Sequence, residues 1–275
     1  MSKRPEHQAP PEIFYNEDEA RKYTQNTRII DIQAQMTERC LELLLLPEDT
    51  SCLLLDIGCG SGLSGAVLEE SGHMWIGMDI APAMLEVALE REAEGDLVLS
   101  DMGEGVPFRA GSFDGAVSVS AIQWLFNADK KSHKPVKRIY NFFSTLYAAL
   151  SRSARAVFQF YPENESQLEL LTSQAMKAGF YGGVVVDYPN SAKAKKFFLV
   201  LMTGGAAPLP QALGTEESDS LQVKYAKREA SKNARGKPLK NSRAWIIEKK
   251  ERRRKQGKET KPDTKFTGRK RAGRF

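Results

Sequence analysis

Short apolar runs alternate with amphipathic segments from residue 52 onward. Only the eight residues from Tyr188 to Lys195 separate the last two runs, which is too short for a crossover helix, so those two runs should pair antiparallel. The alternation predicts an α/β domain built on a seven-stranded, mostly parallel sheet with a final antiparallel strand. The expected strands are Cys52–Asp56, Met74–Ile80, Asp96–Met102, Asp114–Ala121, Ala154–Tyr161, Val184–Asp187 and Lys196–Met202.

Helical patterns fill the intervals between these runs and also precede the first of them. Upstream, Glu17–Leu46 carries apolar residues at spacings of three and four and predicts one long helix. Pro82 suits the first turn of its helix, and Gly179 suits a C-terminal cap. The expected helices between the strands are Leu63–Glu70, Pro82–Ala93, Arg138–Ser151 and Gln167–Ala178.

Charge is distributed unevenly along the 275 residues. Residues 221–275 carry 21 Lys and Arg against 5 Asp and Glu, whereas residues 1–220 carry 19 against 30. An acidic globular body is therefore joined to a strongly basic tail. The tail has too little apolar content to offset the entropy of ordering its backbone, so we expect it to order on a polyanion, and nucleic acid is the favoured one.

Composition also excludes several classes of protein. No stretch approaches the roughly 18 consecutive apolar residues of a membrane-spanning helix, and the first residues lack the apolar core of a signal peptide. We therefore expect a soluble intracellular protein with no membrane partner. Cys40, Cys52 and Cys59 show neither a CxxC spacing nor a neighbouring His cluster, so they predict no disulfide framework and no bound metal.

The strongest local signal is the sequence LLLDIGCGSGLSG at Leu53–Gly65. An apolar strand ends in Asp56 and passes through a glycine-rich turn into a helix, an arrangement that exposes backbone N–H groups to a polar ligand. Gly60, Gly62 and Gly65 also satisfy the G-x-G-x-x-G spacing of dinucleotide-binding folds, so two kinds of nucleotide ligand compete.

Acidic residues at three successive strand ends favour S-adenosylmethionine over NAD. Asp56 would accept from a cationic group, Asp79 from both ribose hydroxyls, and Asp101 from the adenine amino group, whereas a pyrophosphate would be repelled. Met102 would line the face of the adenine ring. The predicted cofactor site comprises Asp56, Gly58, Gly60, Gly62, Asp79, Ile80, Asp101, Met102 and Ser118.

The segment after the fourth strand holds the methyl acceptor in class I methyltransferases, and here it reads SVSAIQWL, at Ser118–Leu125. It lacks the [DNS]-P-P-[YF] motif that serves adenine-N6 and glutamine-amide acceptors. No Pro-Cys pair follows a strand either, so methylation of a pyrimidine carbon through a cysteine nucleophile has no candidate residue. The remaining acceptors are those that need little activation.

Several longer motifs together resemble one family from end to end, the eukaryotic small-subunit rRNA (guanine-N7)-methyltransferases of the Bud type. The N-terminal block and the FTGRKR ending are more specific than DIGCGSG, which many methyltransferases share. The motifs are PPEIFYNEDEARKY at Pro10–Tyr23, LDIGCGSGLSG at Leu55–Gly65, GDLVLSDMGEGVPF at Gly95–Phe108, SAIQWL at Ser120–Leu125, FYPEN at Phe160–Asn164 and KFTGRKRAGRF at Lys265–Phe275.

This resemblance implies methyl transfer to N7 of one guanine in 18S rRNA during assembly of the small ribosomal subunit. It also implies a heterodimer with the small zinc-binding methyltransferase activator, in which the zinc belongs to the partner. In the family the partner adds a strand at the edge formed by the third strand, here Asp96–Ser100. The same resemblance implies a location in the nucleus, in the nucleolus or nucleoplasm, with the cytoplasm as an additional compartment.

The implied chemistry needs no catalytic side chain, because guanine N7 carries an in-plane lone pair and no hydrogen. A flipped base would stack on aromatic side chains, for which we expect Trp124 and Tyr161, while Tyr15 and Tyr23 are candidates for a lid over the cofactor. Two alternatives stay open. One is a small-molecule methyltransferase with a nuclear targeting tail, and the other is a methyltransferase-like scaffold of pre-ribosomes.

The expected domain organisation follows from these assignments. Residues 1–46 would form an N-terminal lid and helix, and residues 47–203 the class I methyltransferase domain. Residues 204–240 would form a linker, and residues 241–275 a basic tail that binds RNA or the pre-ribosome.

Overall fold

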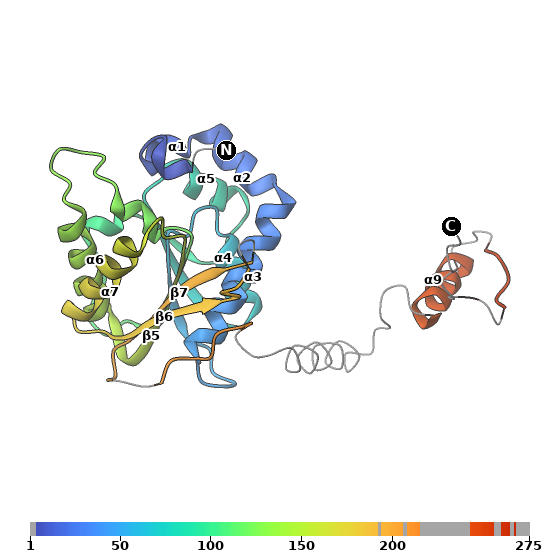
Figure 1. Ribbon diagram of the computed structural model, residues 1–275. Coiled ribbons are helices and arrows are strands. Elements are labelled where there is room, and N and C mark those ends of the chain that lie inside the picture. Colours follow the sequence, from blue (N-terminus) through green and yellow to red (C-terminus); the bar gives the residue numbers. More distant parts are fainter. Residues whose placement is uncertain are drawn as a thin grey trace. The chain divides into compact units, whose positions relative to one another are not determined.

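The computed structural model describes residues 4–191, 194–205, 208–214, 243–255, 260–264 and 267 (Figure 1). The chain divides into two compact units, Met1–Thr215 and Glu216–Phe275. Within the described ranges, no helix is both long and apolar enough to span a bilayer.

A seven-stranded sheet forms the centre of the first unit, with the strand order β3-β2-β1-β4-β5-β7-β6. The pairs β2–β3, β1–β2, β1–β4 and β4–β5 are parallel, whereas β7 runs antiparallel to both β5 and β6. The predicted sheet and its antiparallel pair are therefore confirmed. The strands are β1 (Leu53–Ile57), β2 (Met74–Asp79), β3 (Asp96–Leu99), β4 (Phe113–Val119), β5 (Leu150–Phe160), β6 (Tyr181–Asp187) and β7 (Lys196–Met202).

Helices cover both faces of this sheet, as Figure 1 shows. Because neighbouring side chains of a strand point to opposite faces, the consecutive residues Leu54 and Leu55 of β1 enter two different cores. Leu55 packs with α6 and α7, and Leu54 packs with α3 and α4. The helices are α1 (Pro11–Phe14), α2 (Glu17–Gln25), α3 (Thr27–Leu44), α4 (Leu63–Glu70), α5 (Pro82–Glu90), α6 (Pro135–Ala149) and α7 (Glu165–Lys177).

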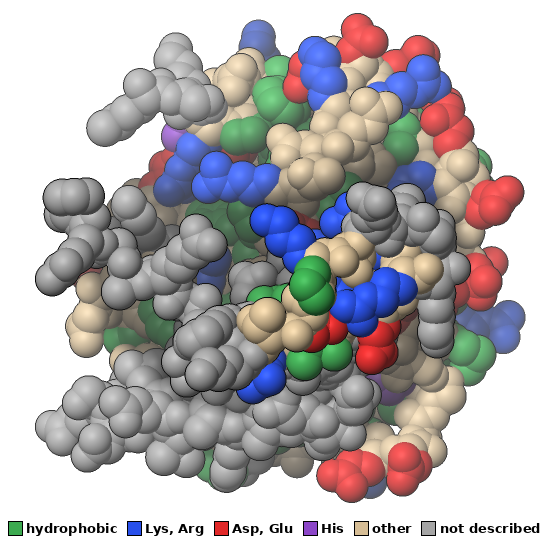
Figure 2. All heavy atoms as spheres, turned by 90° about the vertical axis from the view of Figure 1, so that its right-hand side faces the viewer, with side chains coloured by type: hydrophobic (Ala, Val, Ile, Leu, Met, Phe, Trp, Pro, Cys, Tyr) green, Lys and Arg blue, Asp and Glu red, His purple; other side chains and the backbone are tan. Residues whose placement is uncertain are grey.

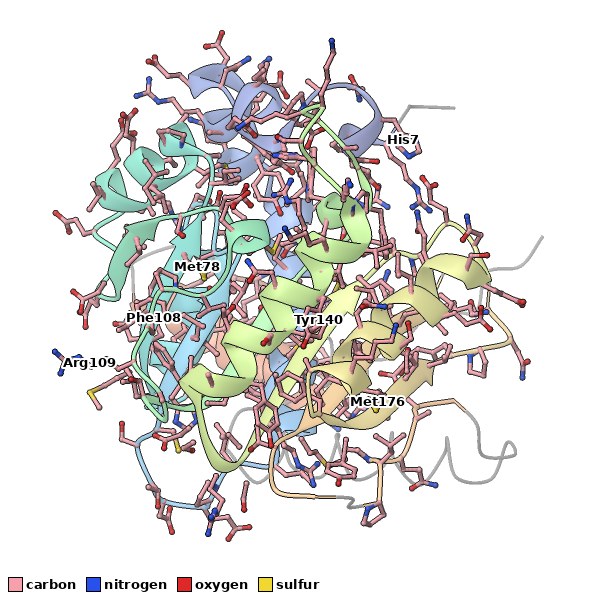
Figure 3. All side chains as sticks on the ribbon, turned by 90° about the vertical axis from the view of Figure 1, so that its left-hand side faces the viewer. His7, Met78, Phe108, Arg109, Tyr140 and Met176 are labelled. Carbon is pink, nitrogen blue, oxygen red and sulfur yellow. The ribbon has the colours of Figure 1, made fainter. Side chains whose placement is uncertain are left out.

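The labelled side chains of Figure 3 illustrate the difference between interior and surface. Met78 of β2 lies inside the molecule with 1% of its surface exposed, whereas Arg109 points away from the body. Tyr140, on the outer side of α6, is 42% exposed.

Figure 2 shows acidic side chains along one margin of the molecule, in agreement with the net negative charge of residues 1–220.

The N-terminal helical region differs from the sequence prediction in one respect. The single helix expected over Glu17–Leu46 is wrong, because Asn26 divides it into α2 and α3. The backbone of Asn26 is extended, and its side-chain oxygen accepts from the N–H groups of Arg28 and Ile29. Asparagine is favourable at the N-cap of a helix, where its side chain satisfies free N–H groups, and unfavourable in the helix interior, which explains the break.

An ion pair joins the N-terminal helices to the far edge of the sheet. Arg39 of α3 donates from Nε and Nη2 to the carboxylate of Asp187, at the end of β6, at 2.9 and 3.2 Å. Arg39 also donates to the carbonyl of Gln211, and the N–H of Leu213 donates to Asp187. Residues 211–213, inside the predicted linker, are thus fastened to the first unit.

The second unit contains α9 (Arg243–Lys255), which lies within the predicted basic tail. Asp263 accepts from Lys250 at 2.8 Å and from Arg254 at 2.7 Å, so the chain beyond the helix returns to it. Residues 215–242 and most of the FTGRKR ending lie outside the described residues.

Candidate functional site

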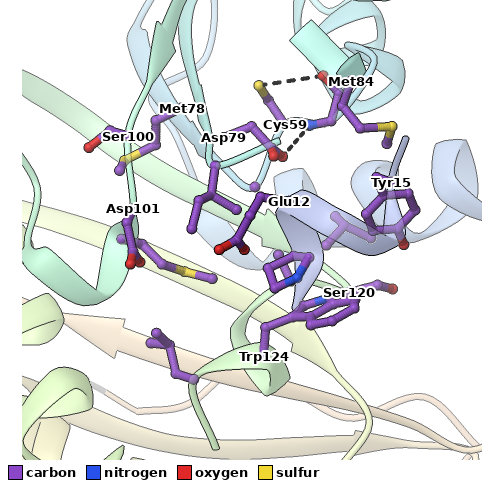
Figure 4. Close-up of a pocket in the computed structure, with 18 of the residues that line it drawn as sticks. Glu12, Tyr15, Cys59, Met78, Asp79, Met84, Ser100, Asp101, Ser120 and Trp124 are labelled. Carbon is purple, nitrogen blue, oxygen red and sulfur yellow. Dashed lines mark hydrogen bonds between the residues drawn. The ribbon is translucent and has the colours of Figure 1, made fainter. Parts of the chain in front are cut away.

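A pocket lies at the carboxyl ends of β1, β2 and β4, where open α/β sheets bind their ligands (Figure 4). Its floor is the glycine-rich turn after β1, and its roof is the N-terminal segment with α1 and α2. Among the predicted site residues, those that line the pocket are Gly58, Gly60, Asp79, Ile80, Asp101, Met102 and Trp124.

The glycine turn has the backbone geometry that its sequence indicates. Gly58, Gly60 and Gly62 all have positive φ angles, of 73°, 53° and 77°. A Cβ atom on Gly58 would lie 2.3 Å from the Cβ of Ala121, so only glycine fits there. Gly62 is the N-cap of α4 and lies outside the pocket lining, where it shapes the turn.

Asp79 ends β2 and connects the glycine turn to the start of α5. Its Oδ2 accepts from the N–H of Gly60 at 2.9 Å, and its Oδ1 accepts from the N–H of Ala81 at 2.8 Å. Burial raises the pKa of Asp79, and these backbone hydrogen bonds oppose that rise. Each carboxylate oxygen keeps a free lone pair, so Asp79 can still accept from a pair of ribose hydroxyls.

Asp56 is fully buried behind the glycine turn and does not line the pocket. Its Oδ2 accepts from the Ser64 hydroxyl at 2.5 Å, while its Oδ1 has no hydrogen-bond partner among the described residues. Burial raises the pKa of Asp56 to about 7, the Ser64 hydrogen bond lowers it, and the charge of Asp79 raises it further. The orphaned oxygen marks a place where a cationic group at the turn would be stabilised.

Asp101 is not the free strand-end carboxylate that the sequence indicated. The strand β3 ends at Leu99, and Asp101 caps the short 3-10 helix η2 (Met102–Glu104) by accepting from the N–H of Gly103 at 2.8 Å. Arg138 of α6 donates from Nη2 to both of its oxygens at 2.6 and 2.7 Å. Three of about four acceptor positions are therefore used, and one remains for an amino group.

Ser118 lies deeper than a cofactor-binding residue would. It is fully buried, its hydroxyl donates to the carbonyl of Ile57 at 2.7 Å, and it joins β4 to β1 outside the pocket lining. The pocket residue of this segment is Ser120, which has a positive φ of 57° and donates to Gln159 Oε1 at 2.9 Å. A serine in this conformation stores backbone strain where the strand leads into the acceptor segment.

Aromatic side chains form one wall of the pocket. Trp124, in the 3-10 helix η3 (Ile122–Phe126), has tilted ring contacts with Phe14 and Tyr15, with centroids 6.3 and 6.1 Å apart. Tyr15 also packs edge-on against Tyr23. Burial, together with the charges of Asp79 and Glu6, raises the pKa of Tyr15 to about 12, so its phenol stays neutral.

Tyr161 is not brought to this wall. Its hydroxyl lies 3.4 Å from the sulfur of Met36, its ring packs on the core shared with α3, and Lys196 Nζ lies 5.3 Å from its ring centroid. The structure thus places it among packing residues. Cys59 does line the pocket, but burial raises the pKa of its thiol well above the usual value, so the thiolate nucleophile is not available.

The roof of the pocket is held down at several points. Arg4 donates to the carbonyl of Tyr161 at 3.0 Å, and Asn127 donates to the carbonyl of Glu6 at 2.7 Å. His7 Nε2 contacts the Glu163 carboxylate. These contacts connect the N-terminal segment to the ends of β5 and η3, and Tyr15 and Tyr23 of this segment line the pocket.

The pocket residues that sequence reasoning missed include the polar residues Glu12, Gln33, Ser120 and Arg138. Glu12 lies within the PPEIFY block, whose position before a helix gave no sign that it would face a ligand. Arg138 is separated by 37 residues from Asp101, so no local pattern links the two. Ser120 was within the acceptor segment, where its place two residues after Ser118 was the available signal.

Two clusters of carboxylates and histidines in the described part of the chain have the spacing of metal ligands, namely Glu6–His7–Glu163 and Asp101–Glu104–His133. In the second cluster the guanidinium of Arg138 contacts both Asp101 and His133. A metal ion would be repelled by that positive charge. The first cluster lies at the surface, where the contact between His7 and Glu163 joins the N-terminal segment to the chain after β5.

The residues present fit S-adenosylmethionine by observations independent of any pattern. An orphaned carboxylate oxygen lies behind the turn, the Asp79 carboxylate lies at the end of β2, and the apolar side chains of Ile80 and Met102 line the same pocket. The segment after β4 contributes the ring of Trp124, which packs against Tyr15, and the hydroxyl of Ser120, which donates its hydrogen bond to Gln159. Such a site can position a methyl donor against a planar acceptor without a general base.

Comparisons with known proteins agree with this geometry. Residues 55–141 match the model of a methyltransferase domain family, and residues 201–273 match the family described as "Methyltransferase involved in Williams-Beuren syndrome". A structure of a putative S-adenosyl-L-methionine-dependent methyltransferase from Methanococcus maripaludis superimposes with a TM-score of 0.54. It is 13% identical and covers 70% of this chain and 96% of its own, and therefore supports the fold alone.

Curated relatives match over the whole length. The 18S rRNA (guanine-N(7))-methyltransferase of Mus musculus is 62% identical over 100% of this chain and 99% of its own. The 18S rRNA (guanine(1575)-N(7))-methyltransferase of Saccharomyces cerevisiae is 50% identical over 99% of both chains. Since the similarity spans both the glycine turn and the basic tail, the chain belongs to the family of 18S rRNA (guanine-N(7))-methyltransferases.

Proposed function

We propose that this protein transfers the methyl group of S-adenosylmethionine to N7 of a guanine in 18S rRNA during small-subunit biogenesis. The observation that carries the proposal is the pairing of an acid-lined cofactor pocket with an acceptor side made of Trp124 and Tyr15. The full-length identity to 18S rRNA (guanine-N(7))-methyltransferases selects the acceptor.

The chemistry asks little of the protein beyond positioning. The cofactor supplies an electrophilic methyl group on a sulfonium, and N7 supplies an in-plane lone pair without a proton to remove. Asp79 holds the ribose, and the rings of Trp124 and Tyr15 fix the plane of the base. Holding the two reactants in line at near-attack distance is worth about 7–11 kcal/mol of the barrier, which makes a catalytic base unnecessary.

Methyl transfer to purified ribosomal particles tests the function. Small subunits from cells that lack this protein are incubated with the full chain, its activator subunit and tritiated S-adenosylmethionine. We expect label in 18S rRNA that digests to 7-methylguanosine, and no label with Asp79→Lys. An Asp18→Lys variant, changed at an exposed acid of α2, serves as the control. Label in another nucleoside, or none with the wild-type chain, would refute the proposal.

A partner subunit is part of this proposal. The strand β3 is an edge of the sheet, and Leu99 at its end is 59% exposed, as are Met74 on β2, also at 59%, and Leu89 on α5, at 66%. An unpaired edge flanked by exposed apolar side chains favours strand addition by another chain. We propose that the small zinc-binding methyltransferase activator occupies it, and that the zinc belongs to that subunit.

The basic tail completes the proposal. The first unit carries the pocket, and α9 carries exposed cations such as Arg253 on a helix whose return segment is fixed at Asp263. We assign residues 241–275 to binding of RNA or the pre-ribosome, residues 47–203 to methyl transfer, and residues 1–46 to the lid. Residues 204–240 form the linker, whose first part is fastened to the first unit through Gln211 and Leu213. A protein that modifies assembling small subunits works in the nucleus, in the nucleolus or nucleoplasm.

A further inference from the structure

One carboxylate in the pocket has no assigned partner. Four acids line the pocket, and two of them already have hydrogen-bond partners. Asp79 accepts from two backbone N–H groups, and Asp101 accepts from Arg138. Asp129 is exposed at the rim. Glu12 of α1 is partly buried and forms no hydrogen bond or ion pair with the described residues.

The position of Glu12 separates it from the cofactor-binding acids. Asp79 and Asp101 follow strands of the sheet, whereas Glu12 descends from the roof into the space between Asp79, Asp101 and Trp124 (Figure 4). Its neighbours along the chain, Phe14 and Tyr15, contact Trp124. Both oxygens of this carboxylate are free to accept inside the pocket, so a ligand with hydrogen-bond donors is the natural complement of this position.

Guanine offers those donors, and adenine does not offer the same pair. N7 is common to both purines, so a site aimed only at N7 cannot distinguish them. Guanine presents N1–H and the N2 amino group side by side, which match the two oxygens of an ionised carboxylate, whereas adenine presents the N1 lone pair and would be repelled. Proteins that extrude a base read it through this edge while aromatic rings hold its plane.

We propose, building on the function above, that Glu12 is the guanine-recognition residue, accepting from N1–H and N2–H of the target base while Trp124 and Tyr15 hold its plane. The contact also favours the reaction. The N7 lone pair forms the new bond to the methyl carbon as the carbon–sulfur bond breaks and its electron pair returns to sulfur. The purine thereby gains positive charge, N1–H becomes more acidic, and the hydrogen bond to Glu12 strengthens in the transition state.

The test compares Glu12→Gln with the wild-type full chain, each with the activator subunit. The substrates are small subunits from cells that lack the protein, carrying either guanine or adenine at the target position through mutation of the ribosomal DNA. Glu12→Gln should lower kcat/KM on guanine about 10- to 100-fold, the effect of losing a hydrogen bond to a charged group. The ratio of guanine to adenine methylation should fall with it, because a glutamine amide can donate to adenine N1.

The affinity for S-adenosylmethionine distinguishes recognition of the base from binding of the cofactor. We expect its Kd to stay within about twofold of wild type in Glu12→Gln, which also shows that the variant is folded. Glu17→Gln, the same change at an exposed acid of α2, should leave all values unchanged.

Two results would overturn the inference. One is a Kd for S-adenosylmethionine that weakens in proportion to kcat/KM at a constant guanine-to-adenine ratio, which would assign Glu12 to the cofactor. The other is wild-type kinetics for Glu12→Gln. If the wild-type chain itself methylates no guanine, the proposed function fails, and that outcome is distinct from both.

Discussion

The buried carboxylate of Asp56 should cost the free protein stability that the bound cofactor restores. Its pKa is about 7 in the folded chain, against an ordinary value of 3.8. Between these values the unfolded chain has released the proton and the folded chain has kept it, so the free energy of unfolding falls as pH rises. At up to about 1.36 kcal/mol per pH unit, this single group removes about 2 kcal/mol between pH 5 and pH 7, and the loss levels off above pH 7, near about 3 kcal/mol in total from pH 5.

Asp56→Asn isolates this contribution, because the amide is neutral at every pH and its oxygen can still accept from the Ser64 hydroxyl. We expect the stability of the variant relative to wild type to increase by about 3 kcal/mol between pH 5 and pH 8. Urea denaturation of the full chain without cofactor measures it, with Asp18→Asn as the exposed-acid control. An Asp56→Asn difference that is the same at both pH values would refute the reasoning.

The remaining predictions concern the ligand, the partner and the tail. Asp79→Lys should weaken S-adenosylmethionine binding at least about 100-fold, because it places a cation beside the ribose and the cationic ligand; near-wild-type affinity by calorimetry would remove this assignment. Leu99→Lys, on the exposed β3 edge, should reduce co-purification of the activator subunit and leave the cofactor Kd unchanged, whereas equal yields would show that the edge is dispensable. Deleting residues 241–275 should leave cofactor binding unchanged and flatten the salt dependence of RNA binding by about 0.7–0.9 in the log–log slope for each lost phosphate contact; an unchanged slope would make the tail an address signal.

Local patterns predicted the sheet because its central strands β1, β4, β5 and β7 are mostly buried on both faces and read as apolar runs. The run at Met74–Ile80 and the strand β2 begin at the same residue and end within one residue of each other, and Leu63–Glu70 coincides with α4. The break at Asn26 was missed because the apolar spacing continues through it, while the capping hydrogen bonds that create it are short-range and directional.

The sequence indicated the pocket residues Gly58, Gly60 and Asp79 because they lie at or directly after the ends of β1 and β2, which the chain order already aligns. Ser118 was predicted to line the cofactor site, but it lies too deep in the sheet to reach the pocket. It belongs to β4 itself, where its hydroxyl bonds to β1, and the strand extends to Val119 before Ser120 turns into the pocket. Arg138 and Glu12 come from α6 and the N-terminal roof, so only the folded chain brings them to the site. Contacts between residues so far apart in the chain produce no periodic pattern in the sequence.

Sequencing of 18S rRNA from cells that lack this protein tests the central claim most directly. The guanine that corresponds to position 1575 of the Saccharomyces cerevisiae relative's substrate is examined for the N7 methyl group by reduction and strand cleavage. The account predicts that cleavage disappears in these cells, returns with the wild-type chain, and stays absent with Asp79→Lys. Cleavage at an unchanged level in cells without the protein would contradict it.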